Sequence, residues 1–234
     1  MASELVADGA RAVVLAGSWA RGDAHRASDI DLWAIGRRTG TRVLSREGFM
    51  VTVAFTSPAV ERRKFRDPPR VGGSVPGWRI VRLLHDPSGV AARLRAEARR
   101  FRWAAIGPAC DRWVADEIVR WAEEAIKLVR ALAVGSRPTA AVQRNLLADA
   151  LGFVMAIHRR EFWDSENEFW ERIGRRVGGR WARAQRAALG VSGAGFETSC
   201  RAALRLYALT AEAAAPCLTR EQRKIVDQTL QVIA

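Results

Sequence analysis

Cysteine, histidine and lysine are scarce in this chain of 234 residues, which contains only three of each. Cys110, Cys200 and Cys217 lie far apart and form no Cys-x-x-Cys motif, so the sequence indicates neither a disulfide framework nor a zinc site. The chain also lacks a basic and apolar N-terminal signal, and we expect no apolar run of membrane-spanning length. These absences favour a soluble, cytoplasmic protein without a membrane partner.

Positive charge, by contrast, is abundant, because 38 Lys and Arg face 25 Asp and Glu and give a formal net charge of +13. Nearly all of this charge is arginine, spread along the whole chain, which fits a compositional bias. Nucleic acid is therefore a partner that we consider but do not favour. The positive charge favours a general attraction for anionic nucleotides. It is weaker evidence for binding to a specific nucleic acid polymer.

The most informative stretch begins where an apolar run, residues 12–16, gives way to Gly17 and Ser18. The run is typical of a buried strand, and a polar turn containing glycine is expected after it. Gly17 offers an accessible backbone N–H group, and Ser18 adds a hydroxyl group at the strand end. Both groups suit the oxygen atoms of a phosphate.

Two aspartates follow at the head of a second apolar run, residues 32–35. Side chains alternate between the two faces of a strand, so Asp29 and Asp31 point to one side while Ile30 enters the core. At about 3.3 Å of rise per residue, the two carboxylates start roughly 7 Å apart on one face. They can therefore converge on a divalent cation.

The alternative is a polar loop followed by a pair of surface-facing aspartates. Two acidic residues at the head of an apolar strand need a compensating charge, which makes this alternative the weaker one. A phosphate-binding turn beside paired carboxylates is the smallest set of groups that metal-assisted nucleotidyl transfer requires.

Gly17-Ser18, ten intervening residues and Asp29-Ile30-Asp31 resemble the Gly-Ser…Asp-x-Asp pattern of the DNA polymerase beta-type nucleotidyltransferase superfamily. Arg21-Gly22 and Ser28 match common embellishments of that pattern. The resemblance implies that Asp29 and Asp31 are catalytic and hold Mg²⁺. It also implies a set of nucleotide-binding residues in this region, which consists of Gly17, Ser18, Arg21 and Ser28.

A long helix expected at residues 111–133 carries Glu123 and Lys127 one turn apart. Taken alone, they are an ordinary exposed ion pair, worth about 0.2–0.5 kcal/mol of helix stability. Their surroundings resemble the helical domain of kanamycin (aminoglycoside 4′-) nucleotidyltransferases, a resemblance that spans most of residues 13–170. It implies that Glu123 is the catalytic general base for the acceptor hydroxyl and that Lys127 binds the nucleotide phosphates.

The sequence departs from that family in two places. The relatives carry a third metal-binding carboxylate where this chain has Thr52, and a neutral hydroxyl is a poor ligand for a hard divalent ion. Neither Glu47 nor Glu61 is an obvious replacement. Only about ten residues precede the first strand, and we expect no room there for the helix that usually packs at this place.

Further elements follow from local signals. Residues 48–55 alternate as a strand that places Thr52 opposite Val51 and Val53. Ser57 with Pro58 predicts the start of a short helix that continues to residue 65, and residues 78–84 predict another strand. After residue 90 the sequence predicts helices alone, at residues 90–105, 111–133, 139–161, 165–189, 195–214 and 219–232.

Two of these helices have predicted capping boxes, Ser165 with Glu168 and Thr219 with Gln222. The expected fold class is α/β (α+β). A mixed nucleotidyltransferase sheet with flanking helices occupies residues 1–90, and an all-α helical bundle occupies residues 91–234.

The favoured hypothesis is an Mg²⁺-dependent enzyme that transfers a nucleoside monophosphate from ATP or another nucleoside triphosphate to a hydroxyl group and releases pyrophosphate. The resemblance implies a small-molecule acceptor, aminoglycoside-like compounds among the candidates, and a homodimer. One alternative is a nucleotide-binding or regulatory relative whose catalysis was weakened or lost with the third carboxylate. Another is a nucleotidyltransferase of a toxin–antitoxin pair, although such chains are usually shorter.

Overall fold

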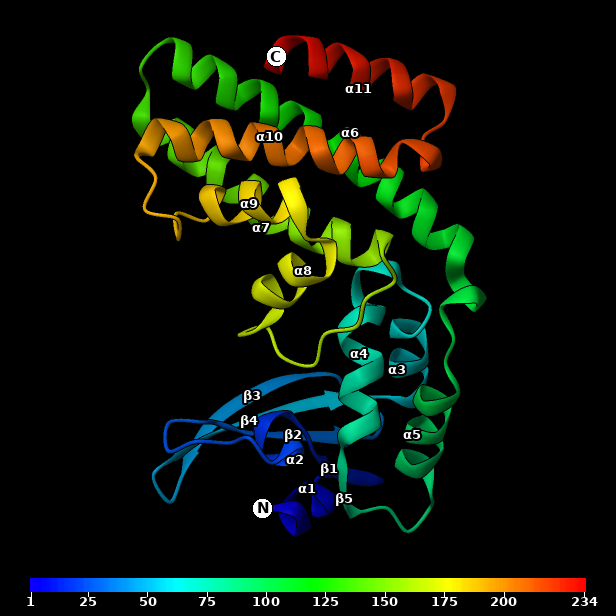
Figure 1. The fold of residues 1–234 in the computed structure, drawn as a ribbon. Coiled ribbons are helices and arrows are strands. Elements are labelled where there is room, and N and C mark those ends of the chain that lie inside the picture. The colour runs from blue at the N-terminus through cyan, green and yellow to red at the C-terminus, as the bar shows by residue number, and fades with distance from the viewer. The chain divides into compact units, whose positions relative to one another are not determined.

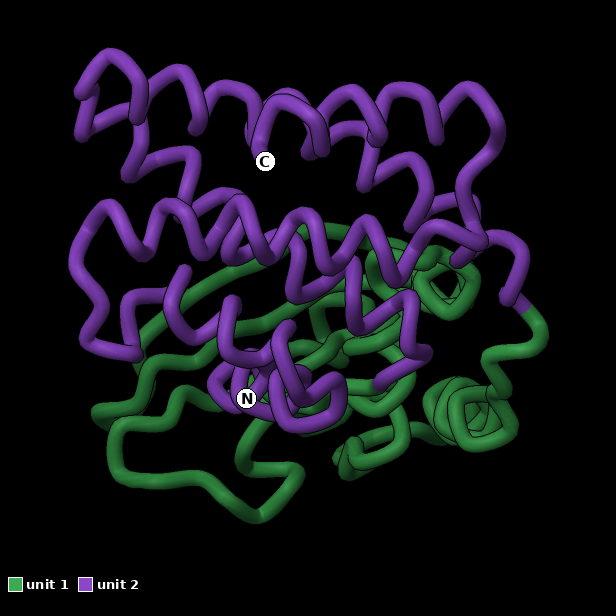
Figure 2. The backbone as a smooth tube through the Cα atoms, turned by 45° about the horizontal axis from the view of Figure 1, so that its top comes forward, with its two compact units in different colours: residues 1–105, 162–165 green, residues 106–161, 166–234 purple.

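The structure of the chain is a computed structural model, and it describes residues 1–234. Contacts divide the chain into two compact units (Figure 2). Unit 1 comprises residues 1–105 with residues 162–165, and unit 2 comprises residues 106–161 with residues 166–234. The division falls after the expected boundary at residue 90, because helix α5 (Val90–Arg100) packs against elements of the sheet unit.

Unit 1 is built on a mixed five-stranded sheet with the strand order β3-β4-β2-β1-β5 (Figure 1). The central strand β2 (Ile30–Ile35) pairs antiparallel with β1 (Ala12–Leu15) and parallel with β4 (Phe49–Thr56). The edge strands are β3 (Gly40–Arg46) and β5 (Arg82–His85). The predicted mixed sheet and the α+β fold class are therefore confirmed.

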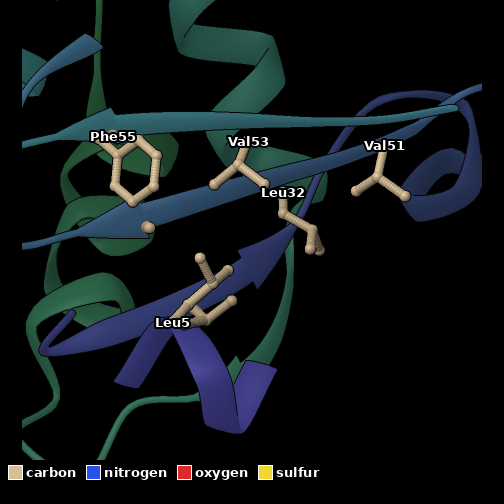
Figure 3. Close-up of a cluster of buried hydrophobic side chains, with 7 residues drawn as sticks. Leu5, Leu32, Val51, Val53 and Phe55 are labelled. Carbon is tan, nitrogen blue, oxygen red and sulfur yellow. The ribbon is translucent and has the colours of Figure 1, made fainter. Parts of the chain in front are cut away.

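One face of the sheet is packed against a short N-terminal helix, α1 (Ala2–Ala7). Leu5 of this helix is wholly buried and points toward Leu32, Val51 and Val53 on the strands (Figure 3). Burial of one leucine side chain contributes about 1.5–3 kcal/mol. The expectation that the leader is too short for a helix is wrong, since six residues suffice to place this one side chain in the core.

The opposite face of β2 carries Trp33, whose ring lies 5.1 Å from that of Trp78 in helix α4 (Pro68–Ile80). Helix α3 (Pro58–Lys64) begins as predicted, with the Ser57 hydroxyl accepting a hydrogen bond from the backbone N–H of Val60 at 3.3 Å. This face also carries Asp31, because Asp31 and Trp33 are two residues apart on one strand.

Two local predictions in unit 1 need correction, and one strand was missed. The turn expected from Gly17 onward is a short helix, α2 (Gly17–Arg21). Residues 78–80 end helix α4, and the strand begins only at Arg82. Strand β3 was not predicted, because its residues are mostly exposed and show no apolar alternation.

Unit 2 is the predicted bundle of helices. Its main helices are α6 (Gly107–Ala133), α7 (Arg137–His158), α10 (Phe196–Ala214) and α11 (Arg220–Ile233). Two 3₁₀ helices, η1 (Trp103–Ile106) and η2 (Ala215–Cys217), lie before α6 and after α10. The bundle is held by apolar packing and by buried hydrogen bonds, such as that from the Tyr207 hydroxyl to the carbonyl oxygen of Ile118 at 3.1 Å.

Of the two predicted capping boxes, that of Thr219 and Gln222 is present and that of Ser165 and Glu168 is absent. The single helix expected at residues 165–189 is two helices, α8 (Phe169–Val177) and α9 (Gly179–Ala188). Gly178, with φ of +68°, separates them, because this left-handed conformation cannot continue a right-handed helix. The helix expected at residues 90–105 ends early, at Arg100.

Helix α7 is also long and apolar enough to pass a test for membrane-spanning segments, contrary to the expectation that no such run exists. Half of its apolar stretch is buried within the protein, where α7 packs against α6 and α10. A core helix of a helical bundle has the same composition and explains this feature.

Candidate active site

The two aspartates of the predicted motif lie at the start of β2, Asp29 just before the strand and Asp31 within it. Both side chains are half-buried. Thr52 of β4 stands beside Asp31 in the parallel register, and its hydroxyl donates a long hydrogen bond of 3.5 Å to Oδ2 of Asp29. The structure thus brings together two carboxylates and one hydroxyl on a single face of the sheet.

Gly17 lies directly against the carboxylate of Asp31. Its backbone has φ of +61°, a left-handed conformation that favours glycine. A Cβ atom at this position would overlap with Oδ2 and Cγ of Asp31. Gly17 is therefore required twice, for its backbone conformation and for the space that the Asp31 carboxylate occupies.

Arg21, at the end of helix α2, has its guanidinium group held on two sides. Its Nε donates to the carboxylate of Asp23 at 2.9 Å, and its Nη1 donates to the backbone carbonyl oxygen of Asp164 at 2.8 Å. The side chain is only 18% exposed. Arg21 is thus placed by the fold rather than left free in solvent.

The two predicted serines have different surroundings. Ser18 is half-buried in the first turn of α2, next to Gly17. The hydroxyl of Ser28 accepts a hydrogen bond from the backbone N–H of His25 at 2.9 Å, and its own N–H donates to the carbonyl oxygen of His25. Ser28 therefore fixes the turn that leads into Asp29.

The surroundings of Asp31 disfavour its ionised form. Burial raises the pKa of Asp31, the neighbouring Asp29 raises it further, and Arg21 opposes both effects only in part. A raised carboxylate pKa means that the ionised form is disfavoured, and a bound cation would relieve this. The residues present therefore fit a divalent cation with oxygen ligands.

No group of three or more His, Cys, Asp or Glu residues in the structure could hold a metal ion. Glu61 does not complete the aspartate pair, because its buried carboxylate already accepts hydrogen bonds from Thr56, Lys64 and Trp78 at 2.6–2.7 Å. Mg²⁺ commonly takes only one or two protein carboxylates and fills its other positions with phosphate oxygens and water. Asp29 and Asp31 suffice for a site of that kind.

Glu123 and Lys127 lie on α6 in unit 2, where they form the expected ion pair at 2.9 Å. Lys127 also contacts Glu124 at 2.9 Å, and these two hydrogen bonds raise the pKa of Lys127. Glu123 is exposed, so its carboxylate is accessible to a ligand.

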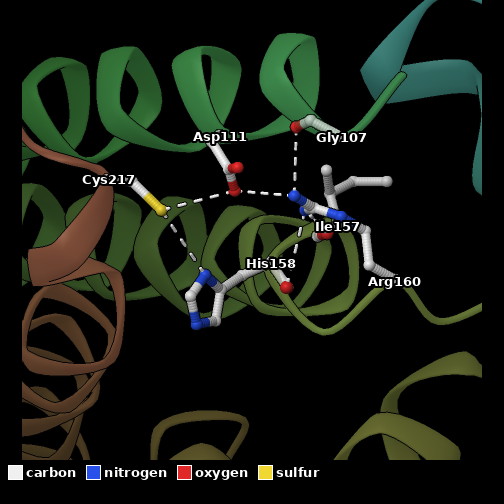
Figure 4. Close-up of polar contacts among 6 residues, drawn as sticks. All are labelled: Gly107, Asp111, Ile157, His158, Arg160 and Cys217. Carbon is white, nitrogen blue, oxygen red and sulfur yellow. Dashed lines mark hydrogen bonds and ion pairs between the residues drawn. The ribbon is translucent and has the colours of Figure 1, made fainter. Parts of the chain in front are cut away.

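Unit 2 holds a polar cluster that the sequence did not predict (Figure 4). Arg160, with φ of +58°, donates to Oδ1 of Asp111, which also accepts a hydrogen bond from the Cys217 thiol at 3.5 Å. The Cys217 sulfur lies 3.9 Å from Nδ1 of His158. The cluster joins the start of α6, the end of α7 and η2.

A cysteine beside a histidine and an aspartate suggests a nucleophile, but the charge states oppose this. Burial and Asp111 raise the pKa of Cys217 to about 11, so the thiol stays protonated at neutral pH. Burial and the charges of Arg159 and Arg160 lower the pKa of His158, which favours a neutral ring. The cluster therefore has the properties of a structural link between α6, α7 and η2.

Two carboxylates on one face of a parallel strand pair, with Gly17 packed against one of them, can hold a divalent cation beside a phosphate. Comparison with known proteins gives a domain family for this region. Residues 3–67 match the family model described as "Nucleotidyltransferase domain", which covers α1 to α3 and both aspartates. Residues 3–67 of unit 1 are thus similar to this domain family.

Among solved structures, the chain is similar to a nucleotidyltransferase-like protein from Exiguobacterium sibiricum, with a TM-score of 0.56 and 10% sequence identity. The similarity covers 97% of this chain and 74% of that protein. At this low identity it supports the fold alone. No curated protein matches the chain in sequence.

Proposed function

We propose that the protein is an Mg²⁺-dependent nucleotidyltransferase that transfers a nucleoside monophosphate from a nucleoside triphosphate to a hydroxyl group of a small molecule. The observation that carries this proposal is the half-buried pair of carboxylates, Asp29 and Asp31, on one face of the sheet, with Gly17 packed against Asp31. A nucleotidyltransferase domain match over the same residues supports it.

In the proposed reaction, the acceptor oxygen attacks the α-phosphorus atom and forms a new P–O bond. The bond between the α-phosphorus and the oxygen that bridges to the β-phosphorus breaks, and pyrophosphate leaves. A bound Mg²⁺ would neutralise charge on the phosphates. Asp29 and Asp31 would hold that ion, and Gly17, Ser18 and Arg21 would bind the β- and γ-phosphates.

We further propose that Glu123 accepts the proton of the acceptor hydroxyl and that Lys127 neutralises charge near the α-phosphate. Glu123 suits this role because its carboxylate is exposed, and Lys127 suits it because an ammonium group is a compact charge for a phosphate. Ser28 contributes indirectly, through the turn that positions Asp29. Aminoglycosides are the first acceptors to test.

The proposal predicts that the protein takes up a nucleoside triphosphate only when Mg²⁺ is present. Isothermal titration calorimetry with ATP, GTP, CTP and UTP, each with and without Mg²⁺, measures this. Pyrophosphate release with a panel of aminoglycosides and other polyhydroxylated acceptors then measures turnover. Absence of Mg²⁺-dependent binding for all four nucleotides would refute the proposal.

A second candidate is a nucleotide-binding protein without catalysis, which the neutral Thr52 beside the aspartates favours. If the missing carboxylate limits catalysis, Thr52→Glu should raise pyrophosphate release at least about ten-fold and increase the thermal stabilisation by Mg²⁺, because a third carboxylate strengthens the cation site. Thr52→Val is the matched control, since it removes the hydroxyl without adding charge. Strong turnover by the wild type would exclude this second candidate.

A further inference from the structure

A four-residue segment of unit 1, far from the motif in sequence, packs against residues 1–105 of that unit. We call residues 162–165 the strap. Its first residue, Phe162, packs its ring 4.9 Å from that of Trp103 and lies under the guanidinium group of Arg79 at 4.6 Å. Trp163 follows and is only 8% exposed. The strap is therefore fixed to residues 1–105 by two aromatic side chains.

Helix α4 contains a socket for Trp163. Two consecutive glycines, Gly72 and Gly73, lie inside this helix, where each costs about 0.5–1 kcal/mol relative to alanine. The indole ring explains them, because a Cβ atom at Gly72 would overlap with the ring and one at Gly73 would lie 2.9 Å from Nε1 of Trp163. The two glycines thus lower the stability of the helix but make room for the indole ring of Trp163.

Pro76 completes the socket. It lies within α4, four residues after Gly72, and it has no backbone N–H to donate to the Gly72 carbonyl oxygen. That carbonyl oxygen instead accepts a hydrogen bond from the backbone N–H of Trp163 at 3.0 Å. Three residues of one helix, Gly72, Gly73 and Pro76, therefore share one purpose, which is to receive Trp163.

The next residue of the strap reaches the candidate active site. The carbonyl oxygen of Asp164 accepts the hydrogen bond from Nη1 of Arg21 at 2.8 Å, while Asp23 holds Nε of the same guanidinium group. These two contacts leave Nη2 of Arg21 for a ligand. Arg21 is also close enough to Asp31 to lower the pKa of that carboxyl by its charge.

We propose that Trp163 is a positioning residue: its docking in the Gly72–Pro76 socket places the Asp164 carbonyl so that Arg21 is aimed at the phosphates of the nucleotide. This inference rests on the proposed nucleotide site. It gives the strap a role in nucleotide affinity. The strap lies outside both the Gly-Ser…Asp-x-Asp motif and the domain match over residues 3–67.

A double-mutant cycle tests this positioning role. Mg²⁺-dependent binding of the nucleoside triphosphate that the wild type binds most tightly is measured by calorimetry for Trp163→Ala, Arg21→Ala and the double variant. We expect Arg21→Ala to weaken binding by at least about ten-fold, the lower end of the range for hydrogen bonds to charged groups. Trp163→Ala should weaken it less, by about five-fold, because Asp23 still holds Nε of Arg21. In the Arg21→Ala background, Trp163→Ala should weaken binding by less than about two-fold, because its effect acts through Arg21.

Equal fold-changes for Trp163→Ala in both backgrounds would overturn the inference while leaving the nucleotide site intact. Absence of nucleotide binding by the wild type would instead refute the proposed function, so the two failures are distinguishable.

Pro76→Ala decides the question if Trp163→Ala unfolds. This substitution returns an N–H group to the helix, and that N–H competes with Trp163 for the Gly72 carbonyl oxygen. Nucleotide binding should weaken by about three-fold although the melting temperature is unchanged or higher. Pro69→Ala is the matched control, because Pro69 lies in the first turn of α4, where no intrahelical hydrogen bond is missing. Wild-type affinity in Pro76→Ala would contradict the positioning role.

Discussion

Replacement of Asp31 by Asn should abolish Mg²⁺-dependent pyrophosphate release and leave the fold at least as stable as the wild type. The loss of activity should be about a thousand-fold or more, because stabilisation of phosphate charge by a metal ion is worth several kcal/mol. The gain in stability follows from the raised pKa of Asp31, which shows that burial and Asp29 disfavour its ionised form. The neutral amide avoids this cost.

The difference in stability between Asp31→Asn and the wild type should be larger at neutral pH than at acidic pH. The folded-state pKa of Asp31 lies above its ordinary value of 3.8, so the folded protein binds more protons than the unfolded chain between these two values. The cost of ionisation is fully present above the folded-state pKa and disappears as the pH falls below 3.8. The advantage of Asp31→Asn is therefore largest at neutral pH and shrinks on acidification.

Thermal unfolding without Mg²⁺ at pH 7 and at stepwise lower pH measures this difference, alongside a pyrophosphate assay. Asp8→Asn serves as the control, because Asp8 is exposed and its only ion pair, with Arg42, is 3.9 Å long. A stable Asp31→Asn variant with wild-type turnover would overturn the assignment of the site. An inactive variant that is also unfolded would leave the carboxylate with a structural role only.

The placement of the two aspartates could be predicted from the sequence because it depends on local geometry. The two-residue repeat of a strand sets Asp29 and Asp31 on one side and Ile30 on the other, whatever the strand pairs with. The same repeat correctly predicted that Thr52 faces away from Val51, and the pairing of β2 with β4 brings its hydroxyl to Asp29.

Features that depend on distant contacts could not be predicted in this way. The Gly-Gly pair and Pro76 of α4 are typical of loops, and only the docked indole of Trp163 explains them within a helix. The positive φ of Arg160 could not be predicted either. It accompanies the hydrogen bond of Arg160 to Asp111, which lies at the start of another helix. Strand β3 was missed because an exposed edge strand needs no apolar alternation.

Gly17→Ala should disable nucleotide binding and turnover without any change of charge. A Cβ atom at Gly17 would overlap with the Asp31 carboxylate, which must then leave its present position. A displacement of this size at a reacting centre commonly costs about a hundred-fold in rate. Mg²⁺-dependent nucleotide binding and pyrophosphate release, measured on the same preparation, should fall together.

The matched control is Gly135→Ala, which separates the effect on the carboxylate from backbone strain. Gly135 has φ of +70°, close to the +61° of Gly17, and a Cβ atom there would meet nothing within 4 Å. Both variants should lose about 1–2 kcal/mol of stability from the left-handed backbone of an L residue. Only Gly17→Ala should lose nucleotide binding. Equal binding by both variants would mean that Gly17 serves only the backbone conformation at the start of α2 and that the Asp31 carboxylate tolerates displacement.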